Sequence, residues 1–261
     1  MNLDLANLAI LWPSLSILWP ALAAGLLVTL THVPLGAQVI RRGIVFIDLA
    51  IAQIAALGVI VAGALGWDAQ GPALQIAALT AALCAALLLT WTERRWPQVQ
   101  EAIIGAVFVL ASSIAVLLLA GNPHGAEHLK DLLVGQILWV DPRRLPLDAL
   151  VYAALAGVWF GLGERIGRAG FYMLFACAVT ISVQLVGLYL VFATLVIPSL
   201  ATFFSRNRQL SRAYTVSALG YAGGLTVSAF TDLPSGPLIV CAMAAAGALV
   251  ATTALSRGNS V

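Results

Sequence analysis

Asp48 is the residue of this sequence whose type and position most directly suggest chemistry. It lies four residues into an apolar stretch, 44–66, and Gln53 follows in the same stretch. An ionisable side chain at membrane depth is energetically costly, so it indicates a functional site, here a substrate path. The two positions are about 140° apart around a helix and share one face only loosely. The alternative is that Asp48 forms an ion pair with Arg41 or Arg42.

His32 is a second candidate for the substrate path. It stands two residues before Pro34 in the preceding apolar stretch. Proline inside a helix removes a hydrogen-bond donor and frees a carbonyl, and polar groups gather around such breaks in transport proteins. His32 is therefore either a transient ligand or a histidine that is hydrogen-bonded to the freed carbonyl.

His124, Glu127 and His128 form a third candidate group, within the segment NPHGAEHLKD. The spacing H-x-x-E-H is also the inverted zinc-peptidase motif, in which two histidines hold zinc and the glutamate activates water. Gly125 disfavours the helix that this motif requires. A loop that collects metal or docks a partner fits better, because imidazole and carboxylate groups bind zinc reversibly. The alternative is a solvated loop without a special role.

The elements that position these residues are apolar helices. Of the 261 residues, 61% are hydrophobic and 9% are charged, against about 25% charged in soluble domains. This composition excludes a soluble globular protein, and the net charge of +2 gives no basis for a nucleic-acid partner. Segments of about 20 apolar residues cross a bilayer as helices. The predicted spans are 18–40, 44–66, 72–91, 102–120, 146–163, 170–186, 187–204, 213–230 and 236–255.

The fold class is therefore all-α: a polytopic helical membrane protein in contact with lipid, with eight or nine transmembrane helices in one domain, residues 1–261. The count stays open because Gln184 and Gly187 could break the region 170–204 into half-helices. If the spans alternate, ten of the 13 basic residues fall on one side, which the positive-inside rule assigns to the cytoplasm. The N-terminus is then outside, the C-terminus is cytoplasmic, and the longest outer loop is 121–145.

Three stretches carry a family resemblance. They are VPLGAQVIRRGIVFIDLAIAQIAALG at 33–58, LLVGQILWV at 132–140, and VGLYLVFATLVIPSLAT at 186–202 with the later TDLPSGPLIV at 231–240. In order and spacing they resemble the permeases of ABC importers that carry zinc, manganese or iron across the bacterial inner membrane. The resemblance implies the type II importer fold and a homodimer. It also implies a separate cytoplasmic ATPase that binds ATP and Mg, an extracytoplasmic substrate-binding protein, and no cofactor or enzymatic activity on this chain.

The resemblance also implies a short cytoplasmic coupling helix after Pro198, over residues 199–208, that contacts the ATPase. The residues themselves fit such a helix. Proline ends the preceding helix and Ser199 can cap a new one. Phe203 and Phe204 would form its apolar contact, and Arg206 and Arg208 its basic end. The alternative is an interfacial anchor, since aromatic and arginine side chains are common at the ends of spans.

The sequence departs from this family at its signature Gly-Asp-Ala-Leu-Ser-His-Ala. In an ungapped alignment Asp48 falls on the family glycine, Leu49 on the aspartate, Ala52 on the serine and Gln53 on the histidine. An amide is a poor zinc ligand compared with an imidazole. Either the metal passes with few direct ligands, or the substrate is not a bare transition metal.

The leading prediction is thus the permease subunit of an ATP-driven divalent-metal importer in the bacterial inner membrane. An ATP-independent ion transporter or channel that uses Asp48 is the first alternative. An intramembrane metallopeptidase that uses His124, Glu127 and His128 is the second. A neighbouring reading frame for a P-loop ATPase, with another for a secreted binding protein, distinguishes the first from the others.

Overall fold

The fold consists of helices packed side by side. The computed structural model describes residues 5–67, 72–119, 137–203, 205, 208–231 and 233–258. Within these ranges there is no strand, and three short 3-10 turns, η1 (Pro97–Val99), η2 (Ile137–Trp139) and η3 (Gly163–Ile166), flank the long helices. The long helices are α1 (Leu5–Arg42), α2 (Ile47–Ala64), α3 (Pro72–Arg95), α4 (Gln100–Leu119), α6 (Leu145–Leu162), α7 (Gly167–Val186), α8 (Leu188–Ala201), α9 (Gln209–Thr231) and α10 (Ser235–Gly258). The predicted all-α fold is confirmed.

Each predicted span corresponds to one of these helices. In the described part of the chain, seven helices are long and apolar enough to cross a membrane: α1, α2, α3, α4, α6, α7 and α10. Helix α8 is shorter, with 14 residues, and α9 is long but carries polar side chains along its length. The break expected between 170 and 204 falls at Gly187, whose φ of +87° is a conformation that glycine adopts most readily.

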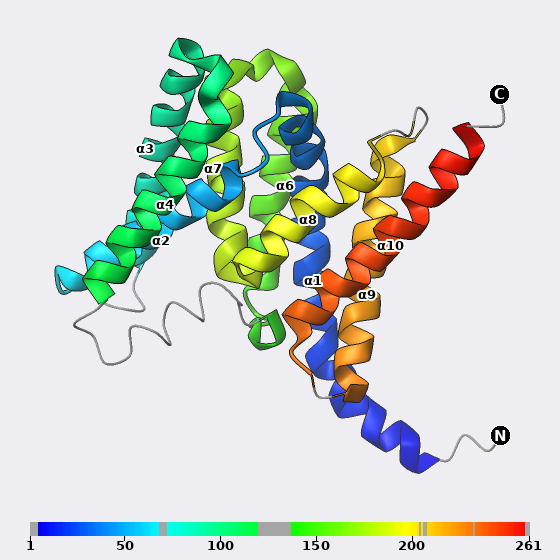
Figure 1. The fold of residues 1–261 in the computed structure, drawn as a ribbon. Helices are drawn as coiled ribbons and strands as arrows, with labels where there is room; N and C mark the ends of the chain where they lie inside the picture. Colours follow the sequence, from blue (N-terminus) through cyan, green and yellow to red (C-terminus); the bar gives the residue numbers. More distant parts are fainter. Residues whose placement is uncertain are drawn as a thin grey trace.

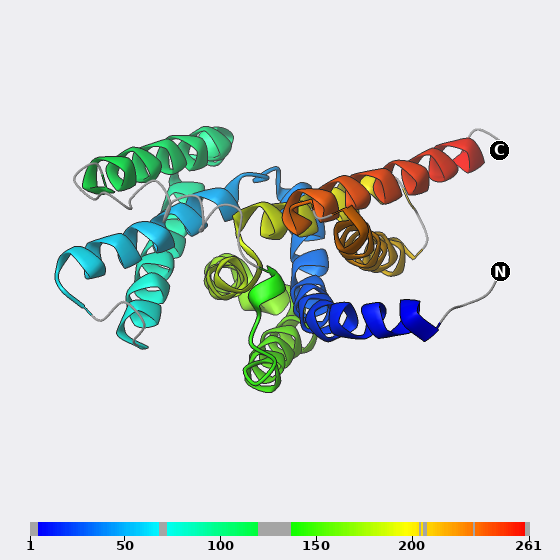
Figure 2. The ribbon, with the colours of Figure 1, turned by 90° about the horizontal axis from the view of Figure 1, so that it is seen from below.

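Helix α1 occupies the middle of the bundle. It packs against α6, α8 and α9, while α2 packs against α3, α4 and α7, and α9 against α10. Seen from below, α3 and α4 lie on one flank and α9 and α10 on the other, with α1 and α7 between them (Figure 2). Large apolar side chains such as Leu117, which is 74% exposed, cover the outside. Such a surface is suited to lipid.

Two glycines allow helix backbones to approach very closely. A Cβ atom on Gly36 of α1 would overlap the carbonyl oxygen of Leu195 on α8, and one on Gly224 of α9 would overlap the backbone of Ile239 on α10. Close approach at small residues is the usual means of packing helices in a membrane, where apolar burial gives little driving force.

Polar side chains in the bundle join helices to one another. The hydroxyls of Tyr152 on α6 and Ser182 on α7 are 2.6 Å apart, and those of Thr194 on α8 and Tyr221 on α9 are 2.9 Å apart. All four side chains are buried. A buried hydroxyl without a partner is costly in an apolar medium, so these pairs satisfy groups that the sequence places at membrane depth.

Most basic residues in the described part of the chain lie near one end of the bundle. Helices α1, α3 and α10 end there, at the top of Figure 1, and α2, α4, α7 and α9 begin there. Arg41 and Arg42 close α1, and Arg94 and Arg95 close α3. Arg143 and Arg144 are at the opposite end, before α6. The alternation of helices agrees with the predicted separation of basic residues between the two ends.

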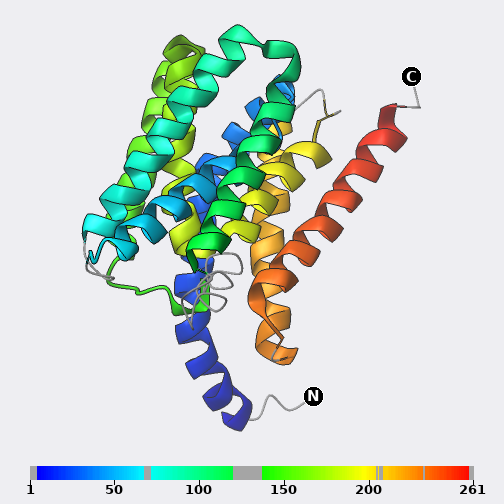
Figure 3. The ribbon, with the colours of Figure 1, turned by 60° about the vertical axis from the view of Figure 1, so that its left-hand side comes forward.

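A tight corner joins α1 to α2. Gly43 has a φ of +68°, and its N–H donates to the Ile40 carbonyl while the Ile44 N–H donates to the Val39 carbonyl, both at 3.2 Å. This pair of bonds is the Schellman motif that ends many helices at a glycine. From the corner, α2 crosses the bundle obliquely, as α8 also does (Figures 1 and 3).

Candidate functional site

An apolar groove lies where α2, α4 and α8 meet. Its volume is about 320 Å³, and it is lined by Leu49 and Gln53 of α2, Phe108, Ser112 and Val116 of α4, and Leu188 and Tyr189 of α8. Leu49 and Gln53 are four residues apart, which places them on one helix face. These are the two positions that the alignment puts on the family's aspartate and histidine. The substitution of both residues therefore leaves the groove with neutral polar groups only.

Asp48 does not line this groove. The side chain is completely buried in the first turn of α2. Neither carboxyl oxygen has a hydrogen-bond partner in the described part of the chain. The group lies in the first turn of the helix, where backbone amides have no partner within the helix.

The two arginines at the end of α1 have other partners than Asp48. Arg41 donates from Nη2 to Oε1 of Gln209 at 3.0 Å. The Arg42 guanidinium lies over the ring of Phe171, 4.2 Å from its centroid, a cation–π arrangement. The alternative in which Asp48 pairs with Arg41 or Arg42 is therefore not what the structure contains.

Glu101 is a second carboxylate close to the start of α2. Its Oε1 accepts a hydrogen bond of 3.2 Å from the backbone N–H of Phe46, the residue that precedes the helix. The carboxylate thus satisfies a donor at the helix end. The sequence analysis missed Glu101, although it begins an apolar stretch just as Asp48 does, and the same criterion would have found it.

His32 is buried in α1. Its Nδ1 lies 3.1 Å from the Val28 carbonyl and donates to it, while Nε2 is buried without a hydrogen-bond partner in the described chain. Pro34 frees the Leu30 carbonyl, and the Tyr214 hydroxyl donates to that oxygen at 3.0 Å. One alternative held that His32 bonds to the carbonyl freed by Pro34. His32 does bond to a backbone carbonyl, but this is the Val28 carbonyl and not the freed Leu30 carbonyl.

The end of α8 differs from the prediction. Helix α8 continues through Pro198 to Ala201, so the expectation that Pro198 ends the helix and Ser199 caps a new one is wrong. Ser199 is buried, and its hydroxyl donates to the Val33 carbonyl of α1 at 3.4 Å. The Thr202 hydroxyl donates to the Pro198 carbonyl at 2.8 Å. Pro198 has no N–H to donate to the Thr194 carbonyl, so it costs α8 one helical hydrogen bond without ending the helix.

The rest of the expected coupling helix is described only in part. Phe203 lies in a turn after α8 and is 44% exposed. Arg208 is exposed with a φ of +57°, directly before α9 begins at Gln209. Phe204 and Arg206 lie outside the described residues. None of the described positions from Thr202 to Arg208 is helical.

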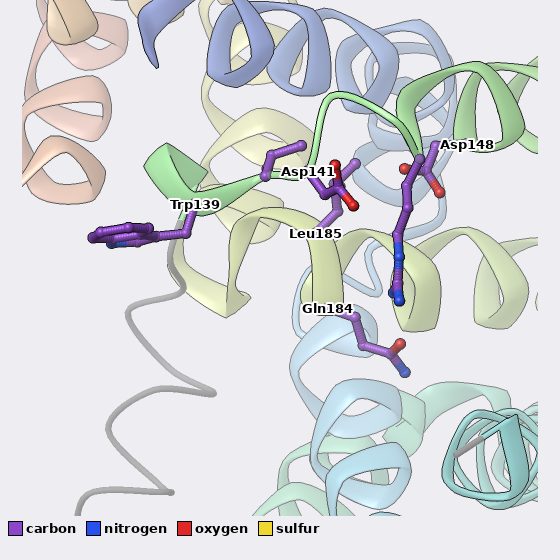
Figure 4. Close-up of a pocket in the computed structure, with 7 residues that line it drawn as sticks. Trp139, Asp141, Asp148, Gln184 and Leu185 are labelled. Atoms are coloured by element: carbon purple, nitrogen blue, oxygen red, sulfur yellow. The ribbon is translucent and has the colours of Figure 1, made fainter. Parts of the chain in front are cut away.

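A polar pocket of about 400 Å³ lies at the opposite end of the bundle (Figure 4). It is lined by Trp139, Val140, Asp141, Arg144, Asp148, Gln184 and Leu185. The side chains of Asp141, Asp148 and Gln184 surround a common space, and the Trp139 ring points away from it. Trp139 is 82% exposed. An exposed tryptophan beside arginine is typical of a protein contact surface.

The group His124, Glu127 and His128 lies outside the described residues, as does most of the predicted loop 121–145. Among the residues that are described, no three histidine, cysteine, aspartate or glutamate side chains come together in a way that could hold a metal ion. The groove and the polar pocket are hollows among the described residues to which a function can be attached.

The helical bundle, the groove that opens on its flank and the separated basic residues define a polytopic membrane transport protein. The chain belongs to the ABC 3 transport family, whose model matches residues 14–160 and 151–254.

Two curated relatives support the family assignment. The chain is 28% identical over 242 residues to the high-affinity zinc uptake system membrane protein ZnuB of Haemophilus influenzae, a match that covers 84% of this chain and 90% of that protein. It is 25% identical over 195 residues to a "Probable metal transport system membrane protein" of Chlamydia muridarum, covering 66% of each.

The fold is similar to that of PsaBC from Streptococcus pneumoniae, solved in complex with Fab. The TM-score is 0.69 at 21% identity, with 90% of both chains covered.

Proposed function

We propose that this chain is the membrane-spanning subunit of an ATP-driven importer for a divalent metal ion, of the zinc, manganese or iron group. The observation that carries the proposal is the groove between α2, α4 and α8. It is lined by Leu49 and Gln53, the two positions that the ungapped alignment puts on the aspartate and histidine of the family signature. Membership of the ABC 3 transport family and the zinc-uptake relative support the same substrate class.

The groove forms one half of the substrate path in this proposal. It opens on the flank of a single chain, so a second copy of the chain is needed to close it, and the working unit is a homodimer. Gln53 and Ser112 supply neutral oxygen atoms in the groove. The buried Asp48 and His32 side chains do not line the groove.

The basic end of the bundle is the cytoplasmic end in this proposal, in agreement with the positive-inside rule. The chain then resides in the bacterial inner membrane with its N-terminus outside and its C-terminus in the cytoplasm. The segment from Ser199 to Arg208, which begins within the last turn of α8, contacts a separate cytoplasmic ATPase that holds ATP and Mg. Exposure of Phe203 and Arg208 at this end is compatible with such a contact.

The opposite end receives the substrate from an extracytoplasmic binding protein. This end holds the polar pocket with Asp141 and Arg144, and the exposed Trp139 beside it. The segment with His124, Glu127 and His128 precedes these residues in the sequence. We assign docking of the binding protein to the pocket and its rim, because exposed tryptophan and arginine side chains contribute most to protein contacts.

The test is reconstitution of the chain in liposomes with the P-loop ATPase and the binding protein encoded in neighbouring reading frames. Uptake of radioactive zinc, manganese or iron is measured with and without ATP. The control carries an ATPase in which the P-loop lysine is replaced, which abolishes hydrolysis. ATP-dependent uptake that this control lacks is the expected result, and absence of such uptake for all three metals contradicts the proposal.

An ATP-independent ion transporter is the second candidate, and the observation in its favour is the buried, unpartnered Asp48 carboxylate. It predicts ion flux through liposomes that contain the chain alone, and loss of this flux in Asp48→Asn. Flux without an ATPase would favour this candidate over the importer.

A further inference from the structure

An exposed hydrogen bond connects the end of α1 to the start of α9. Nη2 of Arg41 donates to Oε1 of Gln209 at 3.0 Å, across 168 residues of sequence. Gln209 is the first residue of α9 and follows Arg208 directly. The bond therefore fixes the last turn of α1 to the residue that follows the segment proposed to contact the ATPase.

The same part of α1 is also pressed against the end of α8. At Gly36 the α1 backbone approaches Leu195 and Ser199 so closely that no Cβ fits between them. Ser199 donates to the Val33 carbonyl. Backbones in direct contact have no flexible side chain between them to absorb a displacement. The ends of α1 and α8 and the start of α9 consequently move together.

The end of α1 leads directly into the helix that lines the groove. Gly43 turns the chain, and α2 begins four residues later at Ile47. The ring of Phe46, in this corner, stacks on Phe192 of α8 with centroids 6.3 Å apart and an interplanar angle of 9°. Helix α2 therefore receives any displacement of α8 by two routes, through α1 and through this stacked pair.

We propose that Arg41 and Gln209 are positioning residues of the transport cycle. Their hydrogen bond carries the displacement of the segment 199–208 through the corner at residues 41–46 to α2, so that ATPase closure moves Leu49 and Gln53 in the groove. This inference rests on the proposed function, and specifically on an ATPase that contacts the segment after Ser199.

Arginine suits this link better than a shorter or more flexible donor. The guanidinium is planar and always charged, and it holds a fixed direction of donation. Within the described residues Arg41 forms no ion pair with a carboxylate, and it donates to the neutral amide of Gln209. Exposed charged contacts are weak, so this hydrogen bond adds little to stability. Its main effect is to hold the end of α1 in a defined orientation relative to the start of α9.

The experiment uses the complete transporter, reconstituted with its ATPase and binding protein, and measures metal ions transported per ATP hydrolysed. The variants are Arg41→Ala, Gln209→Ala and the double variant. Arg95→Ala is the matched control, because Arg95 is also an exposed arginine in the last turn of a helix at the same end. Co-purification of the ATPase and the thermal midpoint are recorded for each variant.

Each single variant is expected to lower the transport ratio by about three-fold or more, a size typical of altered coupling between sites. The double variant should lose no more than a single one, because both remove the same contact. ATPase co-purification and the thermal midpoint should match those of Arg95→Ala. A ratio equal to that of Arg95→Ala, or losses that multiply in the double variant, would overturn the inference.

A further outcome separates the inference from a simple docking role. If Arg41→Ala fails to co-purify the ATPase, Arg41 contacts the ATPase itself and the inference is wrong. If the unmodified chain shows no ATP-driven uptake at all, the proposed function fails first. If it shows uptake and Arg41→Ala matches the control, only the inference fails.

Discussion

Replacement of Gly36 by alanine tests the closest helix contact of the bundle. The added Cβ would lie 2.7 Å from the Ser199 hydroxyl oxygen and 2.8 Å from the Leu195 carbonyl carbon, and closer still to the Leu195 carbonyl oxygen. Ordinary contacts of a Cβ are 3.4–4 Å. Because the obstacle is backbone, the side chains cannot simply turn aside, and α1 and α8 must separate.

The magnitude follows from two effects. Overpacking of a well-packed interior costs about 1–3 kcal/mol. Separation of the helices also breaks the hydrogen bond of 3.4 Å from Ser199 to the Val33 carbonyl, and such a bond contributes about 0.5–1.5 kcal/mol. We therefore expect Gly36→Ala to lower the free energy of unfolding by about 2–4 kcal/mol.

The assay is thermal unfolding of the detergent-solubilised protein, followed by circular dichroism, and denaturant unfolding where it is reversible. Gly157→Ala is the control, because Gly157 also lies inside a helix but a Cβ there meets no atom within 4 Å. Alanine at an open helix position is neutral or stabilising by up to about 1 kcal/mol. If Gly36→Ala unfolds at the same midpoint as Gly157→Ala, the close contact of α1 with α8 is refuted.

Three further predictions concern the bundle, the groove and the docking end. The Thr194 hydroxyl donates to the Leu190 carbonyl, so the Tyr221 hydroxyl is the donor in its bond to Thr194. Tyr221→Phe removes this donor and should lower the free energy of unfolding by about 0.5–1.5 kcal/mol in the same unfolding assay. Gln53→His places an imidazole in the groove and, if the added ligand contributes about 1.4 kcal/mol, should slow zinc release about ten-fold in the uptake assay; an unchanged rate and metal preference would mean that the groove is not the path. Charge reversal at Arg206 and Arg208 should abolish ATPase co-purification or ATP-driven uptake, and full retention of both would contradict the docking assignment.

The apolar pattern was sufficient to predict the helices. Each predicted span corresponds to one helix because a stretch of apolar residues long enough to cross a bilayer has few alternatives to a helix. The break at Gly187 was also predictable, since glycine readily adopts a positive φ. The error at Pro198 arose because a proline near a helix end resembles a stop signal whether the helix ends before it or three residues after it.

The site residues were predictable by type but not by direction. The sequence identified Asp48 and Gln53 as polar residues at membrane depth, but two residues five apart on a helix can face one space or two. In the tertiary structure the Gln53 side chain lines the groove, whereas the Asp48 side chain is buried and does not line it. Tyr189 was overlooked because its place in the groove depends on contacts with distant parts of the chain.

Local hydropathy and the alternation of spans are sufficient to establish a helical membrane protein, the positions of its helices and the end at which its basic residues gather. They do not establish which helix faces meet. The groove, the contact at Gly36 and the bond from Arg41 to Gln209 each join residues that are far apart in sequence, and their formation depends on helix rotation and tilt. Hydropathy is nearly uniform around such helices, so the hydropathy pattern carries little information about how each helix is rotated. Close packing at small residues determines that rotation instead.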